Sequence, residues 1–121
     1  AMVDLVGGPT HLSTNAAGIN IIRVGTAQEM FEAAIQSFPD CAIAVLAAAV
    51  ADYRPETVAN QKIKKKAGGL TIPLARTKDI AATLGKQKQN NQIIVGFALE
   101  TNNELENAKG KLVKKNIDMI V

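Results

Sequence analysis

The chain is poor in aromatic side chains and in cysteine. Its 121 residues include no tryptophan, and aromatic residues make up only 3% of the total: Phe31, Phe38, Tyr53 and Phe97. So few aromatic side chains cannot build the stacking platform with which proteins hold single-stranded nucleic acid. The lone Cys41 has no second cysteine in the chain to pair with, which favours a reducing, cytoplasmic compartment.

Long apolar runs and a secretory leader are also missing. No apolar run approaches the ~20 residues that a membrane-spanning helix needs. The first residues lack the charged-then-apolar pattern and the small-residue cleavage site of a signal peptide. We therefore expect a soluble protein with no membrane partner.

The commonest catalytic and nucleotide-binding motifs do not occur in the sequence. It has neither a Walker loop nor a GxGxxG fingerprint, and no Gly-x-Ser-x-Gly elbow. His11 has no cysteine or histidine at ligand spacing, which argues against a zinc site. The sequence does not identify ligands for any other metal.

The positive charge of the chain is concentrated in one place. The formal net charge is +3, and without Lys62, Lys64, Lys65 and Lys66 the chain has 10 basic against 11 acidic residues. A small, dense basic patch suits a compact polyanion such as a triphosphate better than a nucleic-acid duplex, which calls for a broad basic face. The alternative interpretation is that these lysines form a solvated basic loop that binds no ligand.

The apolar pattern alternates between short strands and helices. We predict strands at residues 2–6, 19–24, 41–50, 70–76, 92–99 and 117–121, and helices at residues 26–38, 77–88 and 101–116. Thr26 with Glu29, and Thr101 with Glu104, have the spacing of capping boxes, and Thr77 is the expected cap of the middle helix. The strands at 41–50 and 92–99 are apolar without alternation, which is typical of strands covered on both faces. Pro73 favours an edge or irregular position for the strand at 70–76.

This alternation predicts one α/β domain over residues 1–121, with a doubly wound, mostly parallel, Rossmann-like sheet flanked by helices. Ligands of such folds bind beyond the carboxyl ends of the strands. Asp52 and the turns at residues 77–80 and 97–101 all fall at such ends.

Each candidate at these strand ends has a functional and a structural interpretation. Asp52 could accept hydrogen bonds from a ligand or simply cap a helix. Lys111 and Lys115 project from one helix face toward a possible anion, or they complement the dipole of the helix carboxyl end. Asp79 suits the dipole of a helix amino end, although free amides there would also attract an anion. The lysine loop lies in about 20 residues without convincing secondary structure, which is typical of a binding loop.

Seven short segments together resemble one known family. They are "GGPT", "TAQEM", "AAAVADYRP", "KIKK", "TKDI", "VGFALETN" and "AKGKLVKKNIDMIV", and the likeness covers essentially the whole chain in order. The family is the phosphopantothenoylcysteine synthetase domain, which in bacteria is usually fused to a flavin-dependent decarboxylase.

The resemblance implies a ligase of coenzyme A biosynthesis. Such an enzyme activates the carboxylate of 4'-phosphopantothenate with CTP as an acyl-cytidylate, releases pyrophosphate, and couples the acyl group to L-cysteine. The resemblance also implies Mg²⁺ with the CTP, a homodimer, no nucleic-acid partner, and FMN only in the fused decarboxylase domain. Residue chemistry alone leaves CTP and ATP open, and the bacterial character of the motifs favours CTP.

The resemblance also assigns roles to individual residues. Lys62 is implied to be both a catalytic and a nucleotide-binding lysine, on a loop that closes over the intermediate. Asp52 is implied to be the carboxylate that contacts the nucleotide. Ala48 and Ala49 are implied to make backbone contacts near the acyl-nucleotide, and Phe97 to pack its side chain on the nucleotide. The nucleotide-binding turn is implied to consist of Lys78, Asp79, Ile80 and Ala81. Lys111 and Lys115 are implied to be a lysine pair at the nucleotide pocket.

Two departures from the family pattern affect the expected activity. Lys78 stands where the family commonly has proline. The family's Gly-rich nucleotide segment and acyl-binding asparagine, and its Asn-Asp continuation, are expected outside these residues, so the chain alone should be a poor synthetase. Two further interpretations stay open: a non-catalytic module that binds nucleotides or polyanions, and an RNA-binding role.

Overall fold

The computed structural model describes residues 1–65, 68–97 and 104–121, without the side chains of residues 104–108. Along the chain the elements are β1 (Val3–Gly7), β2 (Ile19–Arg23), α1 (Ala27–Ser37), the 3-10 turn η1 (Phe38–Asp40), β3 (Ile43–Leu46), β4 (Tyr53–Pro55), β5 (Leu74–Arg76), α2 (Ile80–Gln87), β6 (Ile93–Gly96), α3 (Glu104–Lys115) and β7 (Met119–Ile120). Among the described residues, no helix is both long and apolar enough to cross a membrane.

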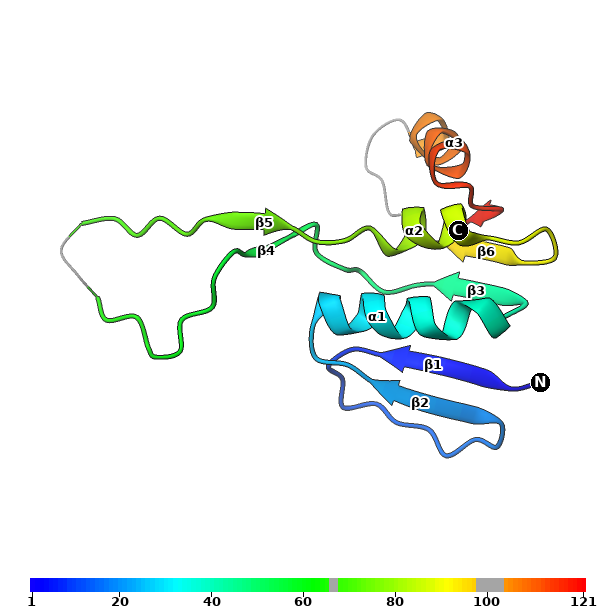
Figure 1. Ribbon diagram of the computed structural model, residues 1–121, viewed down its shortest axis with the longest axis horizontal. Helices are drawn as coiled ribbons and strands as arrows, with labels where there is room; N and C mark the ends of the chain where they lie inside the picture. Colours follow the sequence, from blue (N-terminus) through cyan, green and yellow to red (C-terminus); the bar gives the residue numbers. More distant parts are fainter. Residues whose placement is uncertain (66–67, 98–103) are drawn as a thin grey trace.

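The strands form two parallel groups and one antiparallel ribbon. β1 pairs with β2, and β3, β6 and β7 form a second parallel sheet in that order. The arrows of β1, β2, β3 and β6 point the same way, so their carboxyl ends gather at one rim (Figure 1). This arrangement confirms the predicted α/β class with mostly parallel strands and flanking helices.

Helix α1 begins where its sequence predicts. The Glu29 N–H donates to Thr26 Oγ1 over 3.2 Å, and the Thr26 N–H donates back to Glu29 Oε2 over 3.0 Å. The Gly25 N–H donates to the same carboxylate, and these backbone hydrogen bonds lower the pKa of Glu29. The capping box therefore satisfies amides that the first helical turn leaves unpaired.

Helix α2 begins three residues later than predicted. Asp79, and not Thr77, is its N-cap, because Asp79 Oδ1 accepts a hydrogen bond from the Ala82 N–H at 2.9 Å. The Thr77 hydroxyl instead donates to the Ala51 carbonyl oxygen over 2.6 Å. Helix α3 was predicted over 101–116 and is described over Glu104–Lys115; the capping signal at Thr101 falls outside the described residues.

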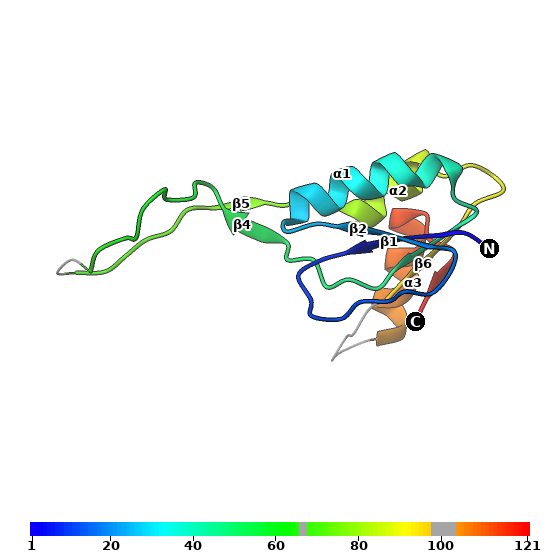
Figure 2. The ribbon, with the colours of Figure 1, turned by 90° about the horizontal axis from the view of Figure 1, so that it is seen from below.

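The core lies on one face of the larger sheet. Phe38, Leu84 and Ile94 are buried, and the inward-facing β3 side chains Ala44 and Leu46 pack against them. Figure 2 shows α1 and α2 on the same side of the strands. Right-handed crossovers explain this, since the steps from β2 to β3 and from β3 to β6 run in one direction across the fold.

The prediction that the strand at 41–50 is covered on both faces is wrong for the described residues. Ile43 and Val45 point away from α1 and are 59% and 60% exposed. In β6 the buried Ile94 alternates with Ile93, which is 47% exposed. The physical reason is that the connections through α1 and α2 step in the same direction across the fold, so these two helices lie on one face of the strands (Figure 2).

The remaining segment forms an arm that extends away from the sheet (Figures 1 and 2). Its base is the antiparallel pair β4–β5, in which Tyr53 pairs with Arg76 and Pro55 with Leu74. The predicted strand at 70–76 is therefore only three residues long and joins a partner, β4, that the pattern did not predict. The predicted strand at 41–50 is also shorter and ends at Leu46.

Candidate functional site

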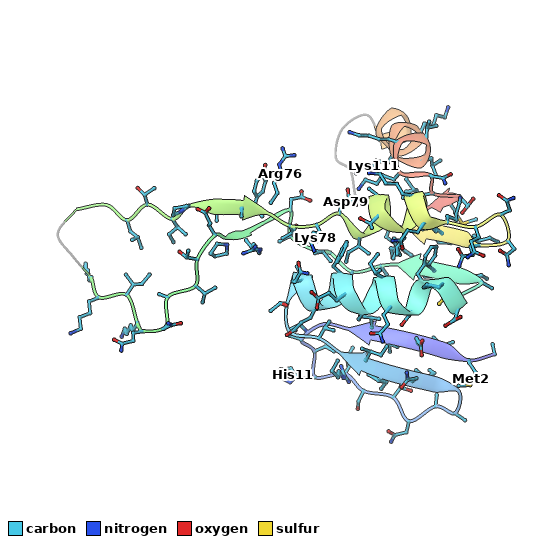
Figure 3. All side chains as sticks on the ribbon, viewed as in Figure 1. Met2, His11, Arg76, Lys78, Asp79 and Lys111 are labelled. Carbon is cyan, nitrogen blue, oxygen red and sulfur yellow. The ribbon has the colours of Figure 1, made fainter. Side chains whose placement is uncertain are left out.

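A cavity of about 560 Å³ opens at the carboxyl ends of β3 and β6. Its lining includes every predicted site residue except Lys62: Ala48, Ala49, Asp52, Lys78, Asp79, Ile80, Ala81, Phe97, Lys111 and Lys115. These residues come from the segment after β3, the start of α2, the end of β6 and the last turns of α3. In Figure 3 Lys78, Asp79 and Lys111 lie at the junction of these elements.

The segment that follows β3 forms one wall of the cavity with small side chains. Residues 47–49 are all alanine, and the Val50 N–H donates to the Ala48 carbonyl at 3.1 Å. The Asp52 carbonyl accepts the Thr77 N–H at 2.9 Å, and Ala51 accepts the Thr77 hydroxyl. These two bonds hold the Asp52 segment against the entry to α2, so residues far apart in sequence share one rim.

Asp79 and Lys115 form an ion pair inside the cavity. Asp79 Oδ2 lies 2.9 Å from Lys115 Nζ, while Oδ1 caps α2 through the Ala82 N–H. Desolvation by itself would raise the pKa of Asp79, but the Ala82 hydrogen bond and the Lys115 ammonium outweigh it and lower that pKa. The carboxylate thus stays charged and anchors Lys115 at the helix amino end.

Lys78 has a partner that the sequence did not indicate. Its ammonium lies 4.8 Å from the centre of the Phe31 ring of α1, within the range of a cation–π contact. Lys78 therefore adds a cation at the cavity wall, next to the helix cap at Asp79. Sequence spacing gives no signal for the pair of Lys78 and Phe31, because 47 positions separate the two residues.

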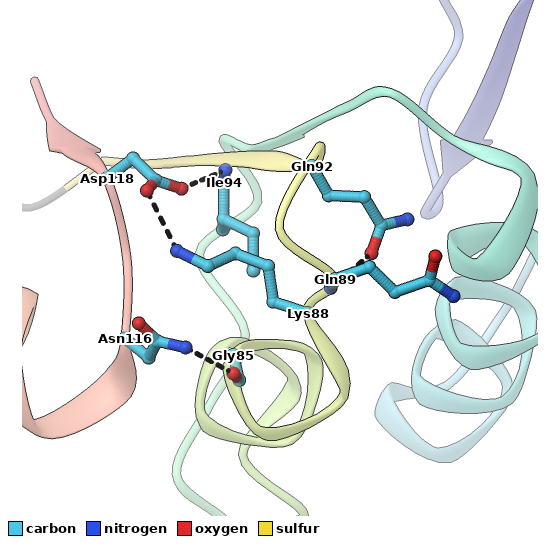
Figure 4. Close-up of polar contacts among 7 residues, drawn as sticks. All are labelled: Gly85, Lys88, Gln89, Gln92, Ile94, Asn116 and Asp118. Atoms are coloured by element: carbon cyan, nitrogen blue, oxygen red, sulfur yellow. Dashed lines mark hydrogen bonds and ion pairs between the residues drawn. The ribbon is translucent and has the colours of Figure 1, made fainter.

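The close approach of α2 and α3 fixes where Lys115 lies. The Asn116 side-chain amide donates to the Gly85 carbonyl at 2.8 Å, and Asn116 adopts a positive φ of 54° just after α3. Lys88 Nζ lies 2.8 Å from Asp118 Oδ1, and Asp118 Oδ2 accepts the Ile94 N–H at 2.8 Å (Figure 4). The ends of α2 and α3 are thereby tied to β6.

Lys62 lies apart from the other predicted site residues. It is exposed on the arm between β4 and β5 and does not line the cavity. Phe97, at the end of β6, is 52% exposed and offers a flat apolar surface at the rim. The sequence pattern predicts Thr77 as a helix cap, which is wrong: its hydroxyl donates to the Ala51 carbonyl and holds the Asp52 segment against α2.

Asp79 variants test the electrostatics at this helix end. We expect Asp79→Ala to lower the free energy of unfolding by about 1 kcal/mol, because the N-cap is lost. Asp79→Asn keeps a capping oxygen and loses only the charge opposite Lys115. Because the pKa of Asp79 is lowered on folding, the stability from its charge is present above pH ~4 and is lost as pH falls through the folded pKa.

Denaturant unfolding of the polypeptide that carries this chain, at pH 7 and at pH 3, measures the effect. The difference between the wild type and Asp79→Asn should shrink at the lower pH, while Asp79→Ala stays less stable at both. A difference between wild type and Asp79→Asn that does not change with pH would contradict the ion-pair assignment.

The fold and the cavity place the chain in the class of parallel α/β domains, with a cation-lined cavity beyond the strand ends. The chain belongs to the family described as the DNA/pantothenate metabolism flavoprotein C-terminal domain, whose model matches residues 1–121. The solved C-terminal domain of the coenzyme A biosynthesis bifunctional protein CoaBC superimposes with a TM-score of 0.78 at 42% identity, covering 98% of this chain and 54% of that one. The Rossmann-like prediction agrees with this structural neighbour.

Several relatives match the chain over nearly all of its residues. The coenzyme A biosynthesis bifunctional protein CoaBC of Vibrio parahaemolyticus is 44% identical over 122 residues, covering 99% of this chain and 30% of the relative. The CoaBC of Borreliella burgdorferi is 42% identical over 123 residues. A prokaryotic protein named cysteine/cysteine sulfinic acid decarboxylase is 53% identical over 121 residues, which are 34% of its length. The chain thus spans about a third of the curated relatives that it matches.

Proposed function

We propose that the chain is part of a phosphopantothenate–cysteine ligase of coenzyme A biosynthesis. The observation that supports it most strongly is the cavity at the strand ends, which gathers the implied nucleotide-binding residues in a chain 42% identical to a solved CoaBC C-terminal domain. The decarboxylation in one relative's name is not assigned to this chain. The matched part of CoaBC is its C-terminal domain, and decarboxylation is expected in a separate FMN-binding domain.

The proposed reaction has two steps. A carboxylate oxygen of 4'-phosphopantothenate bonds to the α-phosphorus of CTP, and the bond to pyrophosphate breaks. The amine of L-cysteine then attacks the activated acyl carbon, forms the amide, loses a proton and displaces CMP. In the first step an anion attacks an anion, so the site must offset charge repulsion and hold the two groups in line.

The cavity supplies cations for this purpose. Lys78, Lys111 and Lys115 all line it, and the amino end of α2 contributes the positive end of a helix dipole. Preorganised positive groups stabilise negative charge that develops during transfer. Lys115 already balances the Asp79 carboxylate, so that acid does not add net repulsion to the site.

The walls of the cavity suit the base and sugar. The alanines at 48 and 49 leave backbone groups accessible to a flat ligand, Asp52 offers an acceptor for hydroxyl or amino groups, and Phe97 offers an apolar face. Ile80 and Ala81 lie in the first turn of α2, where backbone amides are available to an anion. Lys62 would act from the arm.

The expected Mg²⁺ does not fit a protein-held centre in the described part of the chain. Among those residues no group of three or more histidine, cysteine, aspartate or glutamate side chains could hold a metal ion. Mg²⁺ therefore belongs to the proposal only as the counterion that accompanies CTP. The further assignments, which are a homodimer, a cytoplasmic location and no membrane or nucleic-acid partner, remain part of the proposal.

An Asp52 variant tests nucleotide binding directly. In the polypeptide that carries this chain, isothermal titration should show Mg²⁺-dependent CTP binding that weakens about tenfold or more in Asp52→Ala, since a hydrogen bond to a charged group contributes about 1.5–3 kcal/mol. Asp40→Ala is the matched control, because Asp40 is exposed in η1 and does not line the cavity. Equal affinity in all three proteins would remove Asp52 from the proposed site.

Two assays separate the alternatives. Release of pyrophosphate that depends on 4'-phosphopantothenate supports the ligase and contradicts a non-catalytic module. An RNA-binding role would instead show steep salt dependence and little preference for CTP.

A further inference from the structure

The chain leaves α3 through a turn that two backbone hydrogen bonds close. The Ile117 N–H donates to the Leu112 carbonyl at 3.0 Å, and the Asn116 N–H donates to the Val113 carbonyl at 3.3 Å. These two bonds, around a residue in the left-handed region, form the Schellman motif of helix carboxyl ends. Asn116 is that residue, with a φ of 54°. Glycine is the residue that most helices use at such a position.

The side chain of Asn116 explains why asparagine suits this position. Its amide donates to the Gly85 carbonyl oxygen at 2.8 Å, in a partly buried contact between α3 and α2 (Figure 4). Gly85 lies in the last turn of α2, where carbonyl groups lack intrahelical partners. The Gln89 N–H, which would reach Gly85 if the helix continued, donates to Gln92 Oε1 instead. Asn116 thus ends α3 with its backbone and caps α2 with its side chain.

Gly85 supplies the space for this contact. The Lys115 carbonyl lies where a Cβ on residue 85 would be, so the backbone of α3 ends directly on α2. The hydrogen bond from the next residue, Asn116, holds the same point from the side. The backbone of Lys115 is therefore fixed at the carboxyl end of α2.

Lys115 reaches from this point back to the amino end of α2. Asp79 is the N-cap of α2, and six positions separate it from Gly85, which is about 9 Å along a helix. The Lys115 ammonium lies 2.9 Å from Asp79 Oδ2, so the two side chains together span that distance. Spanning it takes most of their combined reach. A small displacement of the end of α3 would therefore separate the ammonium from the carboxylate.

The pKa of Asp79 reports where the Lys115 ammonium lies. Desolvation by burial raises this pKa, whereas the Ala82 hydrogen bond, the hydrogen bond and charge of Lys115 and the charge of Lys114 lower it overall. The Ala82 bond lies within α2 and does not depend on α3. Movement of the end of α3 would therefore change only the lysine contributions.

We propose that Asn116 is a positioning residue of the nucleotide site, which holds the end of α3 on α2 so that the Lys115 ammonium stays beside Asp79 in the cavity. The proposal rests on the function proposed above, because it places Lys115 next to an anionic ligand. Asn116 does not line the cavity and acts through Lys115. Asparagine tolerates left-handed backbone and also carries a donor. Glycine meets only the first requirement, and alanine meets neither.

Asn116→Gly tests the proposal without straining the backbone. Glycine adopts a positive φ freely, so the turn should persist while the side-chain hydrogen bond is lost. Nuclear magnetic resonance titration of the Asp79 carboxyl group, in the isotope-labelled polypeptide that carries this chain, measures the effect. We expect the pKa of Asp79 to rise toward its ordinary value, because the Lys115 ammonium spends less time beside it. An unchanged pKa would overturn the positioning role, whether or not the protein binds CTP.

Lys88→Met is the matched control for this substitution. Lys88 also ties the end of α2 to the sheet, through Asp118 at 2.8 Å, and does not line the cavity. Methionine keeps an apolar stem and loses the ion pair, so this variant loosens the same helix end and leaves Asn116 in place. The pKa of Asp79 should match that of the wild type. An equal rise in both variants would overturn a specific role for Asn116.

Isothermal titration with CTP and Mg²⁺ tests the consequence for the nucleotide. Asn116→Gly should bind CTP about fivefold more weakly, as expected when a partly exposed charge interaction is lost, and Lys88→Met should bind like the wild type. A raised pKa of Asp79 with unchanged CTP affinity would overturn the placement of Lys115 at the nucleotide. A wild-type protein that does not bind CTP would contradict the proposed function, while the Asp79 titration decides the contact separately.

A double substitution tests whether Asn116 acts through Lys115. Residues that share one interaction have non-additive effects, so Asn116→Gly should cause no further loss of CTP affinity in a Lys115→Met background. A further loss of about fivefold would mean that Asn116 affects the site by another route, and would overturn the proposal.

Discussion

Replacing Gly85 by alanine should lower the free energy of unfolding by more than about 2 kcal/mol, because overpacking against rigid backbone is costly. A Cβ at this position would collide with the carbonyl oxygen and carbon of Lys115, where α3 ends. These are backbone atoms, which cannot rotate away as the tip of a flexible side chain can. The clash would force α2 and α3 apart.

Gly110→Ala is the matched control for this substitution. Gly110 lies inside α3, and a Cβ built there meets nothing within 4 Å among the described atoms. Alanine is favoured over glycine in a helix interior by about 1 kcal/mol, so this variant should be slightly more stable than the wild type. Denaturant unfolding of both variants should give effects of opposite sign. Similar effects in both would contradict the close approach of the two helices.

The same contact has a consequence for the cavity. The backbone of Lys115 lies on Gly85, and its ammonium reaches Asp79 at the other end of α2. Separating the helices would therefore also move Lys115 within the cavity. We expect Gly85→Ala to weaken CTP binding together with stability, whereas Gly110→Ala leaves binding unchanged.

Local signals in the sequence predicted part of the fold well. The capping box of Thr26 and Glu29 involves residues three apart, so sequence alone contains everything that the start of α1 needs. The start of α2 was predicted at the wrong residue because two capping residues compete there. The Thr77 hydroxyl bonds to Ala51, which is 26 positions away, and a pattern of neighbouring residues cannot reveal that partner.

Non-local pairing explains what the pattern missed. β4 is three residues long and includes Pro55, so it has no recognisable period of its own, and it exists because β5 pairs with it. The apolar run at 41–50 was predicted as one strand, but the alanines after Leu46 form the rim. Hydrophobicity alone does not distinguish a strand from an apolar wall.

The candidate site was predictable to the extent that parallel strands end at one edge. Asp52, Asp79 and Phe97 follow or precede regular elements at that edge, and the structure brings them to one cavity. The partners of the lysines were not predictable. Lys78 lies over Phe31 and Lys115 on Asp79, and each contact depends on how whole helices pack.

Replacing Lys62 by alanine should slow amide formation by about 10²–10³-fold, as expected when a group that stabilises developing charge is removed. CTP affinity should stay within about twofold, because Lys62 does not line the cavity that holds the other implied nucleotide contacts. The arm that carries Lys62 begins beside Asp52, where Tyr53 pairs with Arg76, so its base lies at the rim. A lysine acting from this arm should affect the reaction more than the binding of nucleotide.

Lys64→Ala is the matched control, since Lys64 is equally exposed two positions along the same loop. Quenched time courses that follow pyrophosphate, acyl-cytidylate and amide product should show the intermediate accumulating in Lys62→Ala and not in Lys64→Ala. Accumulation of the intermediate in Lys62→Ala alone would assign the function to the ammonium group of Lys62. Equal losses in the two variants would mean that the loop acts only through its summed charge, since a diffuse basic cluster does not distinguish its members.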